Sequence, residues 1–264
     1  MPEPPFTRAC GYATQVYAVV DAEARKLRHD PWELLSRAIQ PVLWLVLFGE
    51  VMAHARGLSS GNQPYLDFLA PGILAQSVLF VAIFYGISAI WERDLGVLHR
   101  YMASPAPRSA LVLGKALSSC MRGFSQAAVV YVCAALMGVD LSYDPRRIAV
   151  VALLIALGSM IFSSFSLVIA CIVKTRERFM GIGQVLTMPI FFASNAIYPI
   201  DLMPGWMRAI SLLNPLSYEV DGLRALMLRS GTSGFGLGRD ILTLVVAATV
   251  CIALATRMYP RMTE

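Results

Sequence analysis

Long apolar stretches, separated by short charged segments, dominate the hydrophobic pattern of this chain. Residues 68–91 form 24 consecutive positions without a charged side chain, and residues 148–173 form another 26. As helices rising about 1.5 Å per residue they would extend roughly 36 and 39 Å, more than the ~30 Å thickness of a hydrocarbon core. They do not show the period-two alternation of a membrane β-barrel. The pattern therefore predicts α-helices that span a membrane.

Six membrane spans are predicted when the same pattern is followed along the chain. They are residues 34–52, 68–91, 117–139, 148–173, 182–198 and 241–258. The first has a short charge-free core, 38–49, so Arg37 and Glu50 are expected at its two interfaces. Small residues in the fourth, "ALGSMIFSSFS", fit either close helix packing or a lipid-adjacent helix. The predicted fold class is an all-α integral membrane protein with a single transmembrane domain, residues 1–264.

Composition agrees with this class, and the distribution of charge predicts an orientation. Hydrophobic residues make up 57% of the chain and charged residues 15%, which is too apolar for an ordinary soluble domain. Six spans place both termini on one side, and 15 of the 22 Lys and Arg residues then lie on that side. Because basic residues concentrate in cytoplasmic segments, both termini are expected in the cytoplasm.

Residues 1–33, ahead of the first span, are predicted to form a cytoplasmic amphipathic segment. One helical stripe of this segment is apolar and consists of Val16, Val20, Ala24 and Leu27. Such a pattern is typical of a helix that lies along a membrane surface. Asp30-Pro31 is expected to end this helix and to start the next one. A basic anchor and a docking surface for a cytoplasmic partner both remain open as roles.

Residues 91–116 form the longest predicted cytoplasmic loop, which begins "WERDLGVLHRYMASPAPRS". The charges at its start predict that the second helix continues out of the membrane and stops near Pro105 and Pro107. A new helix is expected to begin near Arg108 and to lead into the third span. The loop is therefore predicted to be a helical elbow just beneath the membrane.

Residues 199–238, between the last two spans, are interrupted too often to be a span or a plain loop. Trp206, Ile210 and Leu213 share one stripe of a short amphipathic helix. Asn214-Pro215 is expected to restart a helix, with Asn as cap and Pro at its first position. Two short helices at this depth predict a re-entrant or outer helical hairpin, and a structured cap without a transport role is the alternative.

Residues with catalytic or ligand chemistry are few and scattered. The five cysteines form no CxxC pair and the three histidines no cluster, so neither a metal site nor a catalytic residue is predicted. Gly114-Lys115 does not complete a phosphate-binding loop, since Ser109 stands where that motif needs glycine and Ala116 where it needs Ser or Thr. The chain itself is expected to bind no nucleotide or other cofactor.

Three segments resemble the type-2 integral-membrane permeases of ATP-binding-cassette (ABC) transporters. The most specific is "ASNAIYPIDLMPGWMRAISLLNPLSYEVDGLR" at 193–224. Residues 92–115, "ERDLGVLHRYMASPAPRSALVLGK", and residues 65–74, "YLDFLAPGIL", are also similar to family segments. Together with six spans, the resemblance covers nearly the whole chain and is closest to the branch of drug-resistance and nodulation-factor exporters.

The resemblance implies a permease subunit that works as a dimer, with a second copy or a paralogue. Each half would bind a cytoplasmic ABC ATPase that carries ATP and magnesium. The expected function is export of an amphipathic, lipidic or drug-like substrate, or of a lipid-linked saccharide, through a bacterial inner (plasma) membrane. Membrane lipids are further expected partners, and nucleic acid is not.

The resemblance also implies roles for three groups of residues. The coupling loop that meets the ATPase would use Glu92, Arg93, Asp94, Gly96, Arg100, Pro105 and Lys115. The interface helix beside it would use Arg25, Lys26 and Arg28. The outer gate would use Tyr198, Pro199, Pro204, Asn214, Pro215, Asp221 and Arg224.

Two other classes of protein remain open alternatives. A secondary transporter or channel without an ATPase would need polar groups inside the spans, for which the candidates are Glu50, Gln76, Gln126 and Gln184. A membrane enzyme acting on lipids would need a base beside Glu219 and Asp221, which the sequence does not offer. Several side chains fit a cavity for amphipathic ligands as well as ordinary packing: Phe80, Phe84, Tyr85, Phe162, Phe165, Met188, Phe191 and Phe192.

Overall fold

The computed structural model describes residues 5–29, 31–54, 65–98, 107–173 and 175–262. Within these ranges the chain is a bundle of helices and turns, with an isolated antiparallel bridge between Leu141 and Leu228. The longer helices are α1 Pro5–His29, α2 Pro31–His54, α3 Tyr65–Tyr85, α6 Arg108–Leu136, α7 Pro145–Ile172, α8 Arg176–Phe192 and α11 Leu237–Met258. The shorter ones are α4 Ile87–Asp94, η1 Ile200–Leu202, α9 Gly205–Leu213, α10 Pro215–Met227 and η2 Tyr259–Met262.

Four helical segments of the described chain are long and apolar enough to cross a membrane. They are Tyr65–Asp94, Arg108–Leu136, Pro145–Ile172 and Leu237–Met262, and they correspond to predicted spans two, three, four and six. The predicted first span falls in α2, whose apolar core is only Ser36–Leu47, and the fifth in α8, which has 17 residues. These two spans remain predictions. The chain is nevertheless a multi-pass membrane protein.

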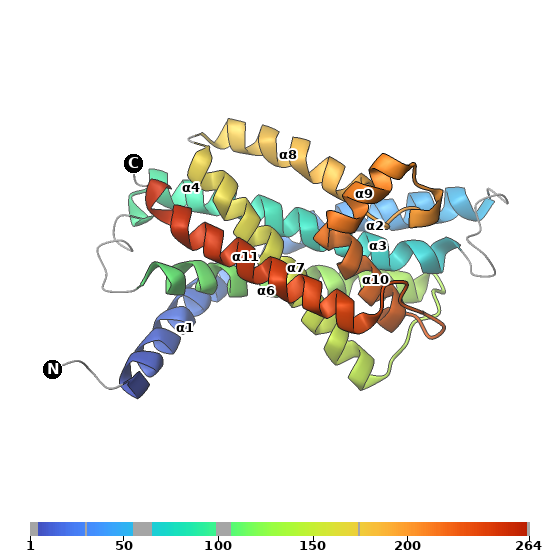
Figure 1. Ribbon diagram of the computed structural model, residues 1–264, viewed down its shortest axis with the longest axis horizontal. Coiled ribbons are helices and arrows are strands. Elements are labelled where there is room, and N and C mark those ends of the chain that lie inside the picture. The colour runs from blue at the N-terminus through green and yellow to red at the C-terminus, as the bar shows by residue number, and fades with distance from the viewer. Residues whose placement is uncertain (1–4, 30, 55–64, 99–106, 174, 263–264) are drawn as a thin grey trace.

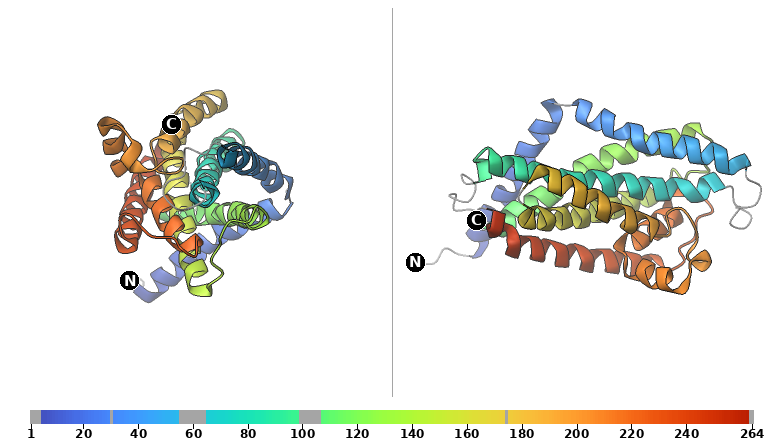
Figure 2. Two further views of the ribbon diagram at one scale, coloured as in Figure 1. Left: turned by 90° about the vertical axis from the view of Figure 1, so that its right-hand side faces the viewer. Right: turned by 90° about the horizontal axis from the view of Figure 1, so that it is seen from above.

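Helix α7 occupies the centre of the bundle and packs against α3, α6, α10 and α11. In the end-on view it lies between α3 and α11 (Figure 2). The central core joins Leu74 and Val78 of α3 to Leu154 of α7 and Leu216 of α10. Both chain termini, α4 and the start of α8 lie at one end of the bundle, and α9 and α10 lie at the other (Figure 1). We call these the terminal end and the far end.

Several helix boundaries lie where the sequence predicts them, because local capping dictates them. Helix α1 ends at His29 and α2 begins at Pro31. Helix α6 begins at Arg108, directly after Pro107. The side chain of Asn214 accepts a hydrogen bond from the backbone N–H of Leu216 at 3.0 Å, as expected for the cap of α10.

Two helix ends differ from the predictions. The helix after span two is interrupted: α4 ends at Asp94, in a turn where Gly96 has φ of 71°, a left-handed value that glycine adopts readily. Residues 97–98 are helical again, and the chain from there to the predicted stop at Pro105 lies outside the described residues. The fifth predicted span continues to residue 198, but α8 ends at Phe192. The reason is Ser194, whose hydroxyl donates to the carbonyl of Phe191 and accepts from the N–H of Ala196, and so competes with helical bonding.

Close approach at Gly72 fixes α3 against the chain that follows α8. A Cβ placed on Gly72 would lie 2.2 Å from the backbone oxygen of Ala196. Gly72→Ala should therefore lower the melting temperature of the purified protein, since overpacking of this kind costs about 1–3 kcal/mol. Gly181→Ala in α8 is the matched control, because nothing lies within 4 Å of the added methyl. Equal melting temperatures for the two variants would contradict this packing.

Candidate functional site

A buried charge cluster joins three helices at the terminal end. We define it as Glu23 and Lys26 of α1, Glu92 of α4, and Lys115 and Arg122 of α6. Glu92 is at its centre: Lys115 Nζ donates to one carboxylate oxygen at 2.6 Å, and Lys26 Nζ donates to the other at 3.0 Å. The side chains of Glu92 and Lys115 are only 8% and 3% exposed, whereas that of Lys26 is half-exposed.

The packing of α1 on α6 brings these charges together. Gly114 leaves room for α1, since a Cβ on it would lie 2.7 Å from the Cβ of Val19. Lys115 and Arg122 are seven residues apart and therefore lie on one face of α6, two turns from each other. Glu23 follows Val16 and Val19 at helical spacing, so the charge continues the packed stripe of α1.

A second set of contacts surrounds the cluster. Arg122 lies 3.7 Å from a carboxylate oxygen of Glu23, and its guanidinium is 4.4 Å from the centroid of the Tyr85 ring. The Tyr85 hydroxyl is 2.9 Å from the hydroxyl of Ser118. Tyr259 of η2 is fully buried and packs with the helices of this end. The C-terminal turn of the chain thus closes the same region.

Opposite charges outweigh the effect of burial on the pKa values of Glu23 and Lys26. Burial alone would raise the pKa of Glu23, but the charges of Lys115, Lys26 and Arg122 and the hydrogen bond from Lys26 outweigh it and lower that pKa below its usual value. Burial alone would lower the pKa of Lys26, but Glu23 and Glu92 raise it. Two carboxylates and three cations therefore stabilise one another in a place where an unpaired charge would be costly.

A separate clasp ties α4 to the start of α8. The guanidinium of Arg176 binds a carboxylate oxygen of Asp94 at 2.8 Å and lies 3.4 Å from the centroid of the Trp91 ring. Arg93 also pairs with Asp94 at 3.3 Å. Ion pairing and cation–π contact together hold the end of α4 in a defined orientation.

The structure brings together two of the three predicted groups. Glu92 and Lys115 of the coupling loop meet Lys26 of the interface helix in the buried charge cluster, while Arg93, Asp94 and Gly96 lie at the clasp and the adjoining turn. Arg25 forms an exposed pair with Asp21, and Arg28 is also exposed. Arg100 and Pro105 lie outside the described residues.

Sequence reasoning missed Glu23, Tyr85, Arg122 and Arg176 as members of this site. The sequence signal for Glu23 is that it follows the apolar Val16 and Val19 at helical spacing, and the structure shows it to be only 4% exposed. A charge at such a position indicates a buried partner on the helix that covers it. Arg122 and Arg176 carried no comparable signal, since their partners are far away in the sequence.

The predicted outer-gate residues lie at the far end, where α10 is firmly anchored. Arg224 donates to the backbone oxygen of Asn195 at 2.9 Å and lies 3.8 Å from the centroid of the Phe68 ring. Asp221 accepts hydrogen bonds from the Ser233 hydroxyl and from the N–H groups of Gly234 and Phe235. The anchoring of α10 therefore involves both α3 and the loop before α11.

Other predicted gate residues shape the chain between α8 and α10. Asn214 donates to the Ile190 oxygen at 2.6 Å, and Tyr198 donates to the Phe192 oxygen. Pro199 precedes η1, Pro204 precedes α9, and Pro215 is the first residue of α10. The predicted apolar stripe of α9 faces outward, with Trp206 68%, Ile210 48% and Leu213 86% exposed. It therefore offers an apolar surface to lipid or to another chain.

Glu219 is a buried acid that the sequence reasoning did not place inside the bundle. It lies outside the six predicted spans, yet α10 brings it against Gly158 in the middle of α7. Its side chain is fully buried, and within the described part of the chain neither carboxylate oxygen has a hydrogen-bond partner. In the same part of the chain, no group of three His, Cys, Asp or Glu side chains gathers as a metal ion would require.

These features define a class: a polytopic helical membrane protein whose charged terminal end is assembled from α1, α4 and α6. Residues 14–228 match the family described as ABC-2 type transporter. The chain belongs to the ABC-2 type transporter family, and the resemblance seen in the sequence is confirmed.

Named relatives agree with this membership. The putative transport permease ycf38 of Cyanophora paradoxa is 28% identical over 83% of this chain and 76% of its own length. The daunorubicin resistance ABC transporter permease protein DrrB1 of Streptomyces coeruleorubidus is 28% identical over 88% of this chain and 81% of its own. Nodulation protein J of Rhizobium leguminosarum bv. trifolii is 27% identical, covering 74% of each chain. Transport permeases are thus its relatives.

The pair at the centre of the buried charge cluster yields a stability prediction. Lys115→Met should destabilise the protein by about 3–5 kcal/mol, because it leaves the buried Glu92 carboxylate with only the half-exposed Lys26. Glu92→Gln should also destabilise it. The double variant should lose less than the sum of the two, since neither partner is then left unpaired.

Thermal unfolding in detergent measures these differences. Arg25→Met is the control, because it removes a cation from an exposed pair in the same helix as Lys26 and should leave the melting temperature nearly unchanged. Strictly additive losses in the double variant would show that Lys115 and Glu92 do not stabilise each other.

Proposed function

We propose that this chain is the permease subunit of an ATP-driven exporter, with energy supplied by a separate ABC ATPase that carries ATP and magnesium. The observation that supports this most is the joining of α1, α4 and α6 by the buried charge cluster in a chain of the ABC-2 type transporter family. Helix α4, which leads into the coupling loop, and the interface helix α1 beside it are thereby fastened to α6. A displacement of α1 or α4 by the ATPase would therefore be transmitted through α6 to the membrane-spanning helices.

In this proposal the terminal end faces the cytoplasm and carries the docking surface. Most Lys and Arg residues belong to segments at this end, in agreement with the rule for cytoplasmic segments. Trp91 and Leu95, at and just beyond the end of α4, are 47% and 70% exposed. Apolar side chains at a helix end, flanked by ion pairs, fit the centre of a protein interface.

The proposed working unit contains two permease chains, either two copies or this chain with a paralogue, in a bacterial inner membrane. DrrB1 is named for daunorubicin resistance and another relative for nodulation. The first of these names refers to resistance to a drug, and we propose an amphipathic, lipidic or drug-like substrate, or a lipid-linked saccharide. Movement of α10 relative to α7 would open the path at the far end.

A secondary transporter or channel without an ATPase is the alternative, and Glu219 favours it. A fully buried carboxyl group without a partner among the described residues is typical of proton-coupled transport. The two proposals differ in their energy source. Transport in vesicles that needs ATP and persists with an uncoupler supports the exporter, and the reverse pattern supports the alternative.

Leu95→Glu tests the docking surface. The change places a charge at a 70% exposed position in the turn after α4 and keeps the backbone hydrogen bond from residue 95 to the Trp91 oxygen, so the protein should still fold. Co-purification with the ATPase encoded beside the gene should fall at least about tenfold, as for loss of an interface anchor. ATP-dependent transport should fall in parallel.

Leu213→Glu is the matched control at the far end, where the side chain is 86% exposed. It should leave ATPase binding unchanged. Wild-type ATPase recovery with Leu95→Glu would show that the α4 turn is not the docking surface.

A further inference from the structure

Glu219 is a fully buried acid on α10, the helix that would move when the far end opens, and ATP-driven export leaves it without a role. Its side chain has no exposed surface, and neither carboxylate oxygen has a hydrogen-bond partner within the described part of the chain. A Cβ placed on Gly158 would overlap both oxygens. The glycine in the middle of α7 therefore leaves the space in which α10 holds an acid inside the bundle.

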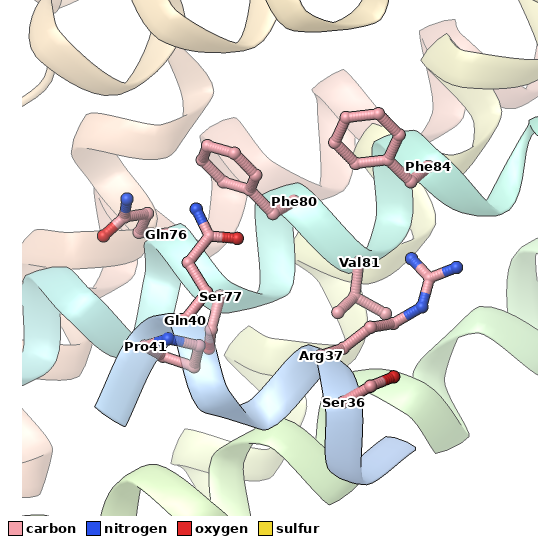
Figure 3. A pocket seen from close by; sticks show the side chains of 9 residues that line it. All are labelled: Ser36, Arg37, Gln40, Pro41, Gln76, Ser77, Phe80, Val81 and Phe84. Atoms are coloured by element: carbon pink, nitrogen blue, oxygen red, sulfur yellow. The ribbon is translucent and has the colours of Figure 1, made fainter. Parts of the chain in front are cut away.

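Two cavities in the described part of the chain do not reach this carboxyl group. The first, of about 260 Å³, lies between α2 and α3, and Figure 3 shows the side chains that line it, among them Gln40 and Phe80. The second, of about 420 Å³, is lined by residues of α7, α8 and α11 and by Pro215 at the start of α10. Glu219 lines neither cavity, so neither gives its carboxyl group contact with water.

The surroundings of Glu219 favour its neutral form. Burial raises the pKa of Glu219 well above its usual value and is the sole cause of the shift. Charged groups on α10 and on the helices packed against it contact other partners: Asp67 of α3, Arg147 of α7, Arg208 of α9, Asp221 and Arg224 of α10, and Asp240 of α11. Arg146 of α7 and Arg239 of α11 are exposed. An ionised Glu219 would therefore be a buried charge without a counter-charge, which is far more costly than a buried neutral carboxyl group.

We propose that Glu219 is a proton-dependent switch for the opening of the far end. Its carboxyl group keeps a proton while α10 packs against α7, releases it to water when α10 moves away, and takes it back before α10 returns. The inference rests on one part of the proposed function, the movement of α10 relative to α7. Because the proton leaves to and returns from the same side, no net proton crosses the membrane and ATP remains the source of energy. This distinguishes the switch from a secondary transporter.

Proton linkage gives the direction of the effect. A carboxyl group that binds its proton more tightly in the closed state than in the open state favours the closed state at low pH. As the pH rises above about 4.3, the ordinary pKa of an exposed glutamate, the open state ionises and the equilibrium constant for opening increases. The increase is about tenfold per pH unit and ends where the pH reaches the pKa of Glu219 in the closed state. A rise in pH therefore favours opening.

Infrared spectroscopy of the permease alone tests whether Glu219 carries a proton. The protein is reconstituted in phosphatidylcholine nanodiscs at pH 7 without ATPase or nucleotide, so the result does not depend on the energy source. The difference spectrum between wild type and Glu219→Gln should contain the C=O band of a protonated carboxyl group. Glu177→Gln makes the same change at an exposed position of α8 and should give no such band. A difference spectrum in which Glu219→Gln removes only a carboxylate band overturns the proposal.

Alkylation of a buried cysteine tests the link to opening. Leu154 of α7 is fully buried beneath α10, where it would lie 2.9 Å from a Cβ on Gly222. Leu154→Cys is made in a chain whose native cysteines are replaced. An uncharged, water-soluble maleimide at low concentration reaches this thiol only when α10 moves away, so the reaction rate follows the opening equilibrium.

The rate is measured from pH 5 to pH 8 in chains with and without Glu219→Gln. Both chains share the pH dependence of the thiol and of the other charged groups, so the ratio of their rates isolates the effect of Glu219. The rate with Glu219, divided by the rate with Glu219→Gln, should rise about tenfold per pH unit from pH 5 until the pKa of the closed state is reached. Glu177→Gln should retain the same rise relative to Glu219→Gln.

A ratio that is equal at pH 5 and pH 8 overturns the switch. Glu219→Leu provides a second neutral side chain, should Glu219→Gln fail to fold, and it should remove the rise as well. Failure of the switch and failure of the export function are distinguishable. A rising ratio in a chain whose transport needs no ATP supports the switch and refutes the exporter, whereas a constant ratio in a chain with ATP-dependent transport refutes the switch alone.

Discussion

The buried pair of Lys115 and Glu92 is the interaction on which the terminal end depends. Either charge alone would be costly at this position, and the pair is stable only because α1, α4 and α6 meet there with further compensating groups. The arrangement therefore specifies which helices must stay together. We expect α1, α4 and α6, joined by these buried charges, to move as one rigid body. The exposed turn at Leu95 follows α4 directly and belongs to the same body.

The far end is held by a different set of contacts, and α7 connects the two. Polar contacts also join α6 to α7. The Ser119 hydroxyl of α6 lies 3.1 Å from the backbone oxygen of Ser159 and 3.0 Å from the hydroxyl of Ser163, both in α7. Near the middle of α7, Gly158 receives the side chain of Glu219 from α10. Helix α7 thus contacts both α6, which belongs to the group of helices that would bind an ATPase, and α10, which would move to open the path at the far end.

The sequence predicts those parts of the structure that local rules determine. Pro31, Pro107 and Asn214-Pro215 set helix boundaries through backbone chemistry, and long charge-free stretches set four apolar helices. The end of α8 was misplaced because a single hydroxyl, that of Ser194, competes with the helix. Long-range charge partners were not predictable, since Arg122 and Glu23 are separated by 99 positions and meet only after α1 has packed on α6.

Distance measurement between labels on α1 and α4 tests most directly whether the charge-linked helices form one body. Arg25→Cys and Ser88→Cys place spin labels at an exposed position of α1 and a half-buried position of α4, both apart from the proposed docking residues Trp91 and Leu95, in a chain whose native cysteines are replaced and in complexes with one labelled permease. Double electron–electron resonance should give a single narrow distribution of distances between the two labels. This distribution should be the same with nucleotide-free and with ATP-bound ATPase. A distance that shifts or broadens with nucleotide would contradict the account, because α1 and α4 would then move independently.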